Sequence, residues 1–446
     1  MSQEVSSANR NLSGQLSQKP QHKNAPADRQ VEGGSACTVL HGVIERKKFQ
    51  GYPYLAFPLT RPADLHQIAV LGNHLPRQCG IATFTADLCD AIVGGFPAIG
   101  CSVLAMNDAD KRYAYPERVR LEIAATDLES HRHAADFLNA GPVDLLSVQH
   151  EYGIFGGNAG SHVLTLLREV RLPIVTTLHT VLARPNVLQR RVMDELTELS
   201  ERLVVMSAAG ASLLGEIYNV PITKIDVIPH GIPVLPNAKE SKYRLGVEGK
   251  SVILTFGLLS AVKGIEHVID AMPAILDHHP NTIYIVLGAT HPSVKEHYGE
   301  RYRVMLENRV MQLGVSSSVI FHNRFVSHDE LTEFLAAADI YITPYLDPEQ
   351  ITSGTLAYAL GAGKAVISTP YSYARELLSD GRGILVPWPK DDPGAIAGAV
   401  VGLLDDDKRR DALRASGTAY GRNMLWPEVA RSYINSFERA RIDYIE

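Results

Sequence analysis

The sequence lacks an excess of charge of either sign. Its 446 residues include 43 Lys and Arg against 49 Asp and Glu, which gives a formal net charge of -6. A chain with this balance has no global basic field, and this argues against a general nucleic-acid-binding protein. We therefore expect any anion-binding site to be local, and no nucleic acid among the partners.

Cysteine is also scarce. The four cysteines lie in the first quarter of the chain and lack the paired spacing of a zinc site or a disulfide framework; they are Cys37, Cys79, Cys89 and Cys101. We expect ordinary reduced thiols and no bound metal.

Long apolar runs are missing as well. No stretch approaches about 18 uninterrupted apolar residues, and no basic segment followed by an apolar one stands at the N-terminus. These absences predict neither a transmembrane segment nor a signal peptide. We expect a cytoplasmic protein, and the sequence leaves peripheral membrane contact open.

The N-terminal part has almost no large apolar side chains. About the first 35 residues are rich in Ser, Gln, Asn, Lys and Gly, so they bury too little surface to offset the entropy of ordering. We predict a disordered or irregular tail over residues 1–64.

What the rest of the chain has is a regular alternation of short apolar runs and amphipathic helical stretches, which is typical of a parallel sheet flanked by helices. The first set of strand candidates is Ile68–Leu71, Ser102–Ala105, Leu145–Val148, Ile174–Leu178, Leu203–Met206 and Ile225–Ile228. After a polar stretch at 236–242, a second set follows at Val252–Phe256, Ile283–Leu287, Val319–Phe321, Ile340–Thr343, Ala365–Ser368 and Gly383–Val386. The helix candidates of the second half are Ile265–Leu276, Arg303–Gln312, His328–Ala338 and Thr355–Ala362.

This pattern predicts an α/β fold with two doubly wound, Rossmann-like domains facing each other across a cleft. We expect one domain over residues 65–235 and the other over 236–423. Open α/β sheets bind ligands outside the carboxyl ends of their strands. Two such sheets would therefore offer places for a nucleotide and a second substrate.

The strongest local feature is a strand, loop, helix and strand over residues 339–369. Ser353 and Gly354 open the helix, so the free N–H groups of its first turn, around Thr355 and Leu356, point into the loop. Such an end suits a phosphate. A Ser-capped helix with only a structural role is the alternative.

At these residues the chain resembles the retaining glycosyltransferases of family 4, also called glycosyl transferases group 1, which have the GT-B fold. The likeness runs from about Gln67 to the C-terminus, and its landmarks, in chain order, are Thr176–His179, Val227–Ile232, Asp339–Pro344, Ala362–Ser368 and Gly381–Pro387. The resemblance implies transfer of a hexosyl group from a GDP- or UDP-sugar to a carbohydrate or other hydroxyl acceptor. It also implies an N-terminal acceptor domain, a C-terminal donor domain, and a last helix, 424–446, that packs back onto the first domain.

Two departures make this a divergent member. The family's donor loop carries a pair of glutamates eight residues apart, and alignment on Ala362–Lys364 puts Gln350 and Tyr358 in their places. The second glutamate of the family holds the ribose hydroxyls, whereas Tyr358 offers one hydroxyl for that task. Glu349 would replace the first carboxylate only if the loop shifted.

Residues 256–264 resemble the family's turn that neutralises the donor diphosphate. Gly257 and Lys263 are kept, but Leu258 stands where the family has an arginine. We expect Lys263 and the following helix N-terminus to share one anion. A solvated lysine in an ordinary turn is the alternative.

The loop of residues 71–88 resembles the family's N-terminal glycine loop, which lies under the diphosphate. Gly80 permits close backbone approach, and Arg77 would add the positive charge that Leu258 lacks. A purely structural turn competes with this interpretation.

Polar side chains also follow two other strands. His150, Glu151 and Tyr152 end one strand and are expected to face the cleft and the acceptor, while His179 ends the neighbouring strand and is expected to contact the donor sugar or stabilise charge. The histidine clusters at 131–133 and 277–279 are predicted to be solvated surface.

We therefore expect metal-independent sugar transfer with retention, in which the leaving phosphate deprotonates the acceptor. Mannose is the preferred sugar only because the family commonly uses it. An inverting enzyme would need a protein base, and Glu151 or His150 is the candidate. The alternatives are a GT-B glycoside phosphorylase, a nucleotide-sugar epimerase, and a non-catalytic sugar- or nucleotide-binding protein.

Overall fold

The computed structural model describes residues 65–108 and 111–445. The tail predicted over residues 1–64 lies outside this part of the chain, and so does Cys37.

The first half of the chain forms a seven-stranded parallel sheet with the strand order β3-β2-β1-β4-β5-β6-β7. Its strands are β1 (Gln67–Gly72), β2 (Gly100–Asn107), β3 (Val119–Ala124), β4 (Leu145–His150), β5 (Ile174–Leu178), β6 (Arg202–Val205) and β7 (Ile225–Val227). Six of these strands match the predicted apolar runs. The prediction missed β3, an edge strand in which exposed polar residues interrupt the apolar run.

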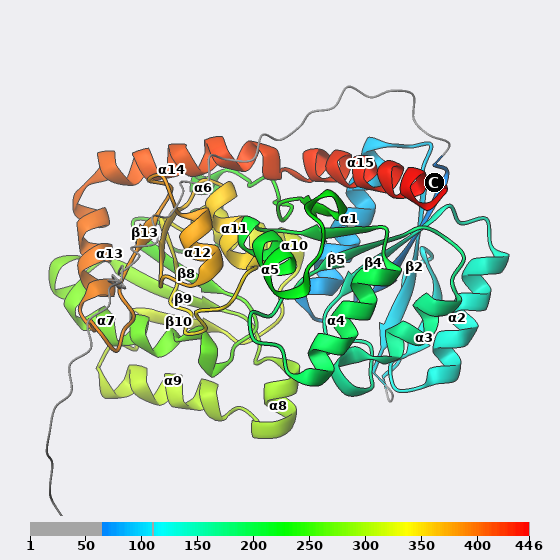
Figure 1. Cartoon of the computed structure of the whole chain (residues 1–446). Helices are drawn as coiled ribbons and strands as arrows, with labels where there is room; N and C mark the ends of the chain where they lie inside the picture. The colour runs from blue at the N-terminus through cyan, green and yellow to red at the C-terminus, as the bar shows by residue number, and fades with distance from the viewer. Residues whose placement is uncertain (1–64, 109–110, 446) are drawn as a thin grey trace, which may run out of the picture. The chain divides into compact units, whose positions relative to one another are not determined.

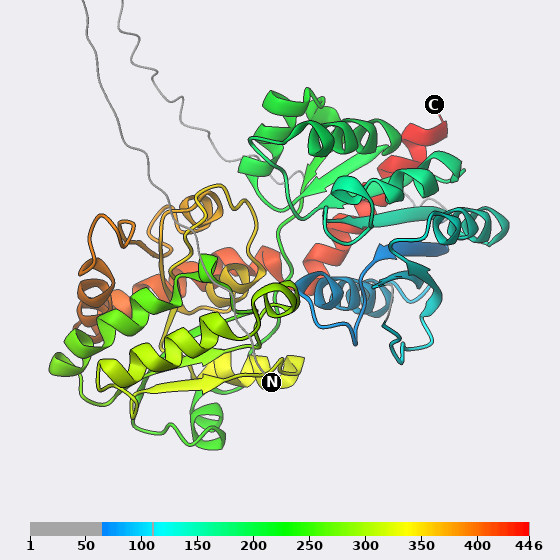
Figure 2. The same cartoon turned by 90° about the horizontal axis from the view of Figure 1, so that it is seen from below.

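Helices cover both faces of this sheet because successive strand residues point to opposite faces. Ala69 and Leu71 pack on one side with α2 (Leu128–Ala140), α3 (His162–Glu169), α4 (Val187–Leu199) and α5 (Ala208–Tyr218). Ile68 and Val70 pack on the other side with α1 (Gly80–Gly95) and the last helix, α15 (Trp426–Ile445). The views of Figures 1 and 2 show the red α15 running beside the blue α1.

The second half forms a six-stranded parallel sheet with the order β10-β9-β8-β11-β12-β13. Its strands are β8 (Ser251–Phe256), β9 (Thr282–Leu287), β10 (Val319–His322), β11 (Ile340–Thr343), β12 (Ala365–Ser368) and β13 (Ile384–Leu385), all at predicted positions. One face carries α7 (Ile265–His278), α9 (Arg301–Gln312) and α13 (Ala395–Asp405), and the other carries α10 (His328–Ala337), α11 (Gly354–Gly361) and α12 (Ser372–Leu377). The remaining helices are α6 (Ala238–Arg244) on α10, α8 (Pro292–Tyr298), and α14 (Asp407–Gly421) on α11.

Both sheets are doubly wound, as predicted. The strand order reverses between β1 and β4 in the first sheet and between β8 and β11 in the second. Ligands of open α/β sheets bind at such switch points, outside the carboxyl ends of the strands. The relevant strand ends are Gly72, His150, Phe256 and Thr343.

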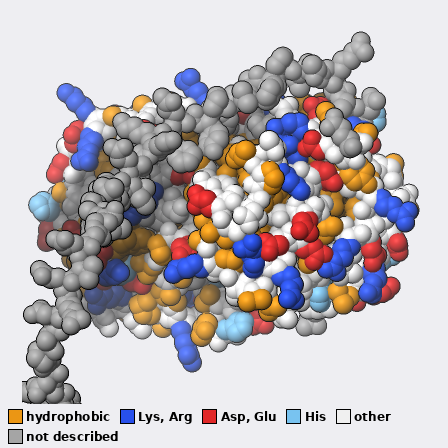
Figure 3. Space-filling view, viewed as in Figure 1, with side chains coloured by type: hydrophobic (Ala, Val, Ile, Leu, Met, Phe, Trp, Pro, Cys, Tyr) orange, Lys and Arg blue, Asp and Glu red, His pale blue; other side chains and the backbone are white. Residues whose placement is uncertain are grey.

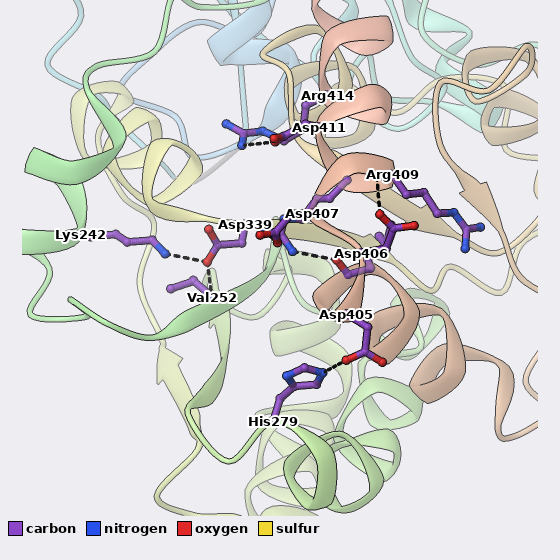
Figure 4. A network of polar contacts seen from close by, with 12 residues as sticks. Lys242, Val252, His279, Asp339, Asp405, Asp406, Asp407, Arg409, Asp411 and Arg414 are labelled. Atoms are coloured by element: carbon purple, nitrogen blue, oxygen red, sulfur yellow. Dashed lines mark hydrogen bonds and ion pairs between the residues drawn. The ribbon is translucent and has the colours of Figure 1, made fainter.

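Two landmarks of the family resemblance hold the second sheet together. The Asp339 carboxylate accepts from the Val252 amide at 2.8 Å and from Lys242 Nζ at 2.7 Å, which ties α6 to the start of β8 (Figure 4). The Lys364 ammonium is buried and donates to the carbonyl oxygens of Ala336 and Ala338 at the end of α10. These two side chains serve the fold.

The surface charges, cysteines and helix lengths of the described chain bear on the predictions. Acidic and basic side chains are interspersed over the face seen in Figure 3. Cys79, Cys89 and Cys101 are free cysteines. Between residues 65 and 445, the described helices include none with the length and apolar character needed to cross a bilayer.

One histidine lies elsewhere than predicted. His131 is completely buried, and its Nδ1 donates to the Asp127 carbonyl at 2.8 Å. It lies three residues before Ala134, on the face of α2 that packs against α3. Its neighbour His133 is exposed, as expected. The prediction of a solvated cluster was therefore wrong for His131, since helical spacing turns the two imidazoles to different faces.

Candidate functional site

Lys263 lies where β8 passes into α7. It ends a single 3-10 turn, Ala261–Lys263, and Gly264, with φ +62°, is the N-cap of α7. A Cβ on Gly264 would lie 2.2 Å from the Pro344 carbonyl oxygen, so this position requires glycine. The turn therefore packs directly against the chain that leaves β11.

Tyr345, which was not predicted to be a site residue, connects Lys263 to the donor loop. The Lys263 ammonium lies 3.8 Å from the centre of the Tyr345 ring, a cation–π distance. The Tyr345 hydroxyl is 2.8 Å from Thr355 Oγ1 on the first turn of α11. One aromatic side chain thus holds the lysine and the helix end together. Its place two residues after the buried central strand β11 was the only signal for it in the sequence.

The first turn of α11 is built as predicted. Ser353 is its N-cap, and Ser353 Oγ accepts from the Leu356 amide at 3.3 Å. The amides of Gly354 and Thr355 have no intrahelical carbonyl to bond, so they are directed out of the helix end. Gly257, with φ +129°, brings the β8 loop close, since a Cβ there would lie 3.3 Å from Thr355 Cγ2. The Leu356 side chain is in the core, and only its backbone belongs to this turn.

His230 approaches the same helix end from the turn after β7. Its Nδ1 donates to the Gly231 carbonyl at 2.8 Å. Its Nε2 lies 2.7 Å from the place that a Cβ of Gly354 would occupy. His230 lies within the Val227–Ile232 landmark and was not predicted to belong to the site. Its contact with α11 bridges residues far apart in the chain, and local pattern gives no sign of it.

His179 lies at the end of β5, as predicted. Its Nε2 is 3.0 Å from Gln149 Oε1, and its ring contacts Phe84 edge to face at 5.1 Å. Burial, together with the nearby His230 and His150, lowers the pKa of His179 to about 3. The imidazole is therefore neutral near pH 7 and offers a hydrogen bond rather than a charge.

Glu151 and His150 differ sharply in their surroundings. Glu151 accepts from the Tyr152 amide at 2.9 Å and from Thr180 Oγ1 at 2.5 Å, and burial raises the pKa of its carboxyl group. His150 is 0% exposed, stacks on Phe155, and, within the described chain, has no hydrogen-bond partner for either ring nitrogen. The expectation that His150 faces a cleft is wrong in this structure, because the last residue of β4 points into the core. Of these two candidate bases, Glu151 is only partly buried, whereas His150 is completely buried.

In the N-terminal glycine loop, Gly80 is free to approach a ligand, whereas Arg77 is already paired. Gly80 begins α1 and is exposed, with open space where a Cβ would stand. The N-cap of α1 is Cys79, whose Sγ accepts from the Ala82 amide. Arg77 donates to the Met106 carbonyl at 2.9 Å and to Asp108 Oδ1 at 2.8 Å. Because Asp108 already neutralises it, Arg77 is held away from the role of a free phosphate cation.

The substituted glutamate positions both have protein partners. Gln350 Nε2 donates to the Thr352 carbonyl at 2.8 Å, which shapes the donor loop. Tyr358 is 4% exposed, and its hydroxyl donates to Asp87 Oδ2 on α1 at 3.0 Å. Glu349 forms an ion pair with Arg184. Donation from Tyr358 to a ribose would have to replace its bond to Asp87, whereas its oxygen can still accept from a ribose hydroxyl.

Two rows of side chains therefore converge on the first turn of α11. Lys263 and Tyr345 reach it from the β8 and β11 ends, and His230 reaches it from β7. Phe84 joins His230 to His179, with ring centroids 5.0 and 5.1 Å away. The arrangement combines an ammonium, helix amides and neutral imidazoles, which suits an anionic ligand bearing hydroxyl groups.

Other features of the described chain do not compete with this site. An open depression of about 550 Å³ lies along α4, where Arg190 pairs with Asp194 and Glu195 pairs with Arg168 on α3. Residues 65–108 and 111–445 contain no group of at least three His, Cys, Asp or Glu side chains that could hold a metal ion.

The comparison with solved structures identifies the fold. The chain is similar to Anabaena HepE in complex with UDP and glucose, with a TM-score of 0.65 and 16% identity over 83% of this chain and 99% of that one. It is also similar to sucrose-phosphate synthase from Thermosynechococcus elongatus, with a TM-score of 0.66 and 17% identity over 82% of this chain and 97% of that one. The protein therefore has the two-sheet GT-B fold of glycosyltransferases.

The family follows from sequence. Residues 79–234 match the model of Glycosyltransferase Family 4, and residues 237–420 match that of Glycosyl transferases group 1. The chain therefore belongs to the group 1, family 4 glycosyltransferases and is a glycosyltransferase.

Two curated relatives are similar to most of the described chain. D-inositol 3-phosphate glycosyltransferase of Xylanimonas cellulosilytica is 27% identical over 60% of this chain and 67% of its own length. Phosphatidyl-myo-inositol mannosyltransferase of Mycolicibacterium smegmatis is 24% identical over 69% of this chain and 74% of its own length.

Proposed function

We propose that this glycosyltransferase moves a hexosyl group from a nucleotide diphosphate sugar to a hydroxyl acceptor, without a bound metal and with retention of configuration. The observation that carries the proposal is the convergence of Lys263, Tyr345 and the first turn of α11. In this proposal residues 236–423 hold the donor, residues 65–235 with 424–446 hold the acceptor, and the protein acts in the cytoplasm.

The proposed chemistry uses that helix end for the leaving group. As the bond from the anomeric carbon to the diphosphate breaks, the Lys263 ammonium and the amides of Gly354 and Thr355 stabilise the charge that develops on the phosphate oxygens. The acceptor oxygen bonds to the anomeric carbon on the same face, and its proton passes to a leaving phosphate oxygen. His179, neutral near pH 7, is the proposed hydrogen-bonding contact for the sugar, and Gly80 lies where the diphosphate would approach α1.

The donor and acceptor follow from the relatives only as a proposal. The names of two relatives point to inositol-containing acceptors and one to mannosyl transfer, while the Anabaena structure holds UDP and glucose. We propose GDP-mannose first and UDP-glucose second as donors. A thermal-shift panel of nucleotide sugars tests this, since a ligand at 100 times its dissociation constant stabilises the fold by about 2.7 kcal/mol. A panel in which no nucleotide sugar raises the melting temperature would contradict the proposal.

Lys263→Ala tests the assigned charge. Removal of one preorganised charge-stabilising group should lower kcat by roughly 10² or more while the fold stays intact. Lys250→Ala is the matched control, because Lys250 is an exposed lysine in the turn before β8, away from the site. Equal turnover for the two folded variants would reject the assignment of Lys263.

Glu151→Gln separates retention from inversion. If the leaving phosphate takes the acceptor proton, the variant keeps most of its turnover, and NMR shows a product with the anomeric configuration of the donor. An inverted product, together with loss of turnover in Glu151→Gln, would make Glu151 the base. A requirement for free phosphate, or reaction without an acceptor, would instead indicate a phosphorylase or an epimerase.

A further inference from the structure

One ring nitrogen of His230 is hydrogen-bonded and the other is not. A carbonyl oxygen only accepts, so the Nδ1 that lies 2.8 Å from the Gly231 carbonyl carries a hydrogen. In the neutral ring Nε2 then has a lone pair. Among the described residues, Nε2 has no hydrogen-bond partner, although the side chain is only 8% exposed. A buried imidazole with one nitrogen left open in this way is available to a ligand.

The open nitrogen faces the α11 helix end. The place for a Gly354 Cβ lies 2.7 Å from Nε2 and 3.2 Å from Cε1 of His230. Gly354 is the first residue of α11, so Nε2 lies beside the amides that receive the phosphate in the proposed function. The helix end and the open imidazole nitrogen are independent observations, and both suit the same kind of ligand atom.

The surroundings keep the imidazole neutral while no anion is present. Phe84 on α1, Tyr358 on α11 and Trp426 at the start of α15 enclose the ring. The titratable groups near it are His179 from β5, Tyr358, and Asp87 behind the Tyr358 hydroxyl. Burial lowers the pKa of His230 to about 4, and its hydrogen bond to Gly231 opposes this shift.

We propose that His230 is a proton-linked ligand of the donor diphosphate: Nε2 takes up a proton when the nucleotide sugar binds at the first turn of α11, and then donates a hydrogen bond to a phosphate oxygen. This inference rests on the proposed function. An opposite charge within about 4–6 Å favours the protonated form, and burial strengthens the attraction. The imidazolium would thus supply, only in the complex, the second positive charge that Leu258 does not provide.

Linkage gives the expected sign. A group that gains a proton on binding makes donor affinity rise as pH falls, by up to tenfold per pH unit when one full proton is taken up. A nucleotide sugar is the right probe because its diphosphate is esterified at both ends and does not titrate between about pH 5 and pH 8, where an imidazole does.

The experiment is calorimetric titration of the full chain with the nucleotide sugar that the thermal-shift panel identifies, in buffers of different ionisation enthalpy, at about pH 6 and about pH 8. Wild-type protein should show net proton uptake that is larger at the lower pH. His230→Asn cannot titrate and should bind without that uptake, with its fold checked by circular dichroism. His133→Gln, which changes an exposed histidine on α2, should behave as wild type.

The outcomes separate the two proposals. Failure of wild-type protein to bind any nucleotide sugar would reject the proposed function. Tight binding without proton uptake would leave the function standing and overturn the role of His230. Uptake that persists in His230→Asn would also overturn it. As a second variant, Gly354→Ala places a methyl group against Nε2, so it should reduce the uptake as well.

Discussion

At the scale of single residues, the cations in the loops and landmarks that resemble the family differ in how much charge they leave free. Asp108 neutralises Arg77, and backbone carbonyls hold the ammonium of Lys364. In the described part of the chain, Lys263 is in no ion pair and rests only on the face of Tyr345. A cation–π contact of about 0.5–1 kcal/mol holds an ammonium without cancelling its charge. Lys263 is therefore the cation best suited to meet a phosphate.

His150 is the residue for which sequence pattern and structure disagree most. It lies between the Tyr152 and Phe155 rings at centroid distances of 5.1 and 5.9 Å. A buried ring stacked on aromatic side chains behaves as an apolar residue. A His directly after an apolar run can face a cleft or be the last core residue of the strand. The sequence pattern is the same in both cases, so it could not distinguish them.

We predict that His150→Phe keeps turnover within about threefold of wild type, because one ring replaces another of similar volume. Burial lowers the pKa of His150 to about 4, so the unfolded chain binds more protons than the folded one between that value and the ordinary pKa of about 6.5. Wild-type protein therefore loses stability as pH falls through this window, and the variant should lose less. Thermal unfolding at about pH 7.5 and pH 4.5 measures the difference. Loss of turnover in a folded variant would restore His150 as a candidate base.

At the scale of elements, the strands could be predicted because parallel strands buried on both faces read as continuous apolar runs. β3 has no such run, since its apolar residues alternate with exposed Arg120 and Glu122, which is the separate period-2 signal of a half-buried strand. The first turn of α11 was readable because Ser353 and Gly354 are local capping signals. Tyr345, His230 and Asp87 were not, because each acts through a partner on another element. Local pattern carries no information on such pairings.

The contact between α1 and α11 is the clearest of these pairings. Tyr358, at the place of the family's ribose glutamate, donates to Asp87, and both side chains are largely removed from solvent. Burial raises the pKa of Asp87 to about 6, although the bond from Tyr358 opposes the shift. In place of the glutamate that the resemblance predicts on α11, this chain has Tyr358, and its hydroxyl donates a hydrogen bond to the Asp87 carboxylate on α1.

We predict that Asp87→Asn is more stable than wild type at about pH 7.5, and that this advantage shrinks toward pH 4. The sign follows from the raised pKa: between about 4 and 6 the folded state holds the proton more tightly, so wild-type stability falls as pH rises through that window. Asparagine keeps an acceptor for the Tyr358 hydroxyl and has no charge to bury. Urea unfolding at both pH values is the measurement.

Tyr358→Phe is the matched partner of this change. It leaves a buried carboxylate without its donor, which should cost about 1–3 kcal/mol at neutral pH. The double variant with Asp87→Asn should lose less than the sum of the two effects. Strict additivity would show that the 3.0 Å contact contributes no coupling.

At the scale of the whole molecule, the described chain runs between the two sheets twice, and the two connecting segments lie together. The Ile232 amide, after β7, donates to the Met424 carbonyl, before α15, at 2.8 Å. A Cβ on Gly231 would lie 2.3 Å from the Trp426 indole, so only glycine fits there. His230 adjoins Gly231 in the first of these segments. The proposed phosphate ligand is therefore part of the connection between the sheets.

The second connecting segment leads into α15, and a buried ion network joins α15 to the first sheet. Asp226 on β7 accepts from Arg202 at 2.7 and 2.8 Å, and from Ser436 and Arg439 on α15 at 2.7 Å. Burial alone would raise the pKa of Asp226, but the two guanidinium groups hold it below its usual value. The last helix is thus fixed to the sheet that begins the fold.

We predict that Asp226→Ala destabilises the protein by about 3–5 kcal/mol at neutral pH, because it removes the buried carboxylate that pairs with Arg202 and leaves this guanidinium only the more exposed Asp443. Asp443→Ala is the control: Asp443 also pairs with Arg202, but its side chain is 44% exposed, and such a pair contributes about 1 kcal/mol or less. The lowered pKa of Asp226 means that its contribution is present above the ordinary carboxyl pKa of about 3.9 and is lost as pH falls through the folded-state value. The gap between Asp226→Ala and wild type, measured by urea unfolding, should therefore narrow in acid. Equal losses for Asp226→Ala and Asp443→Ala at neutral pH would show that the buried network does not hold α15 in place.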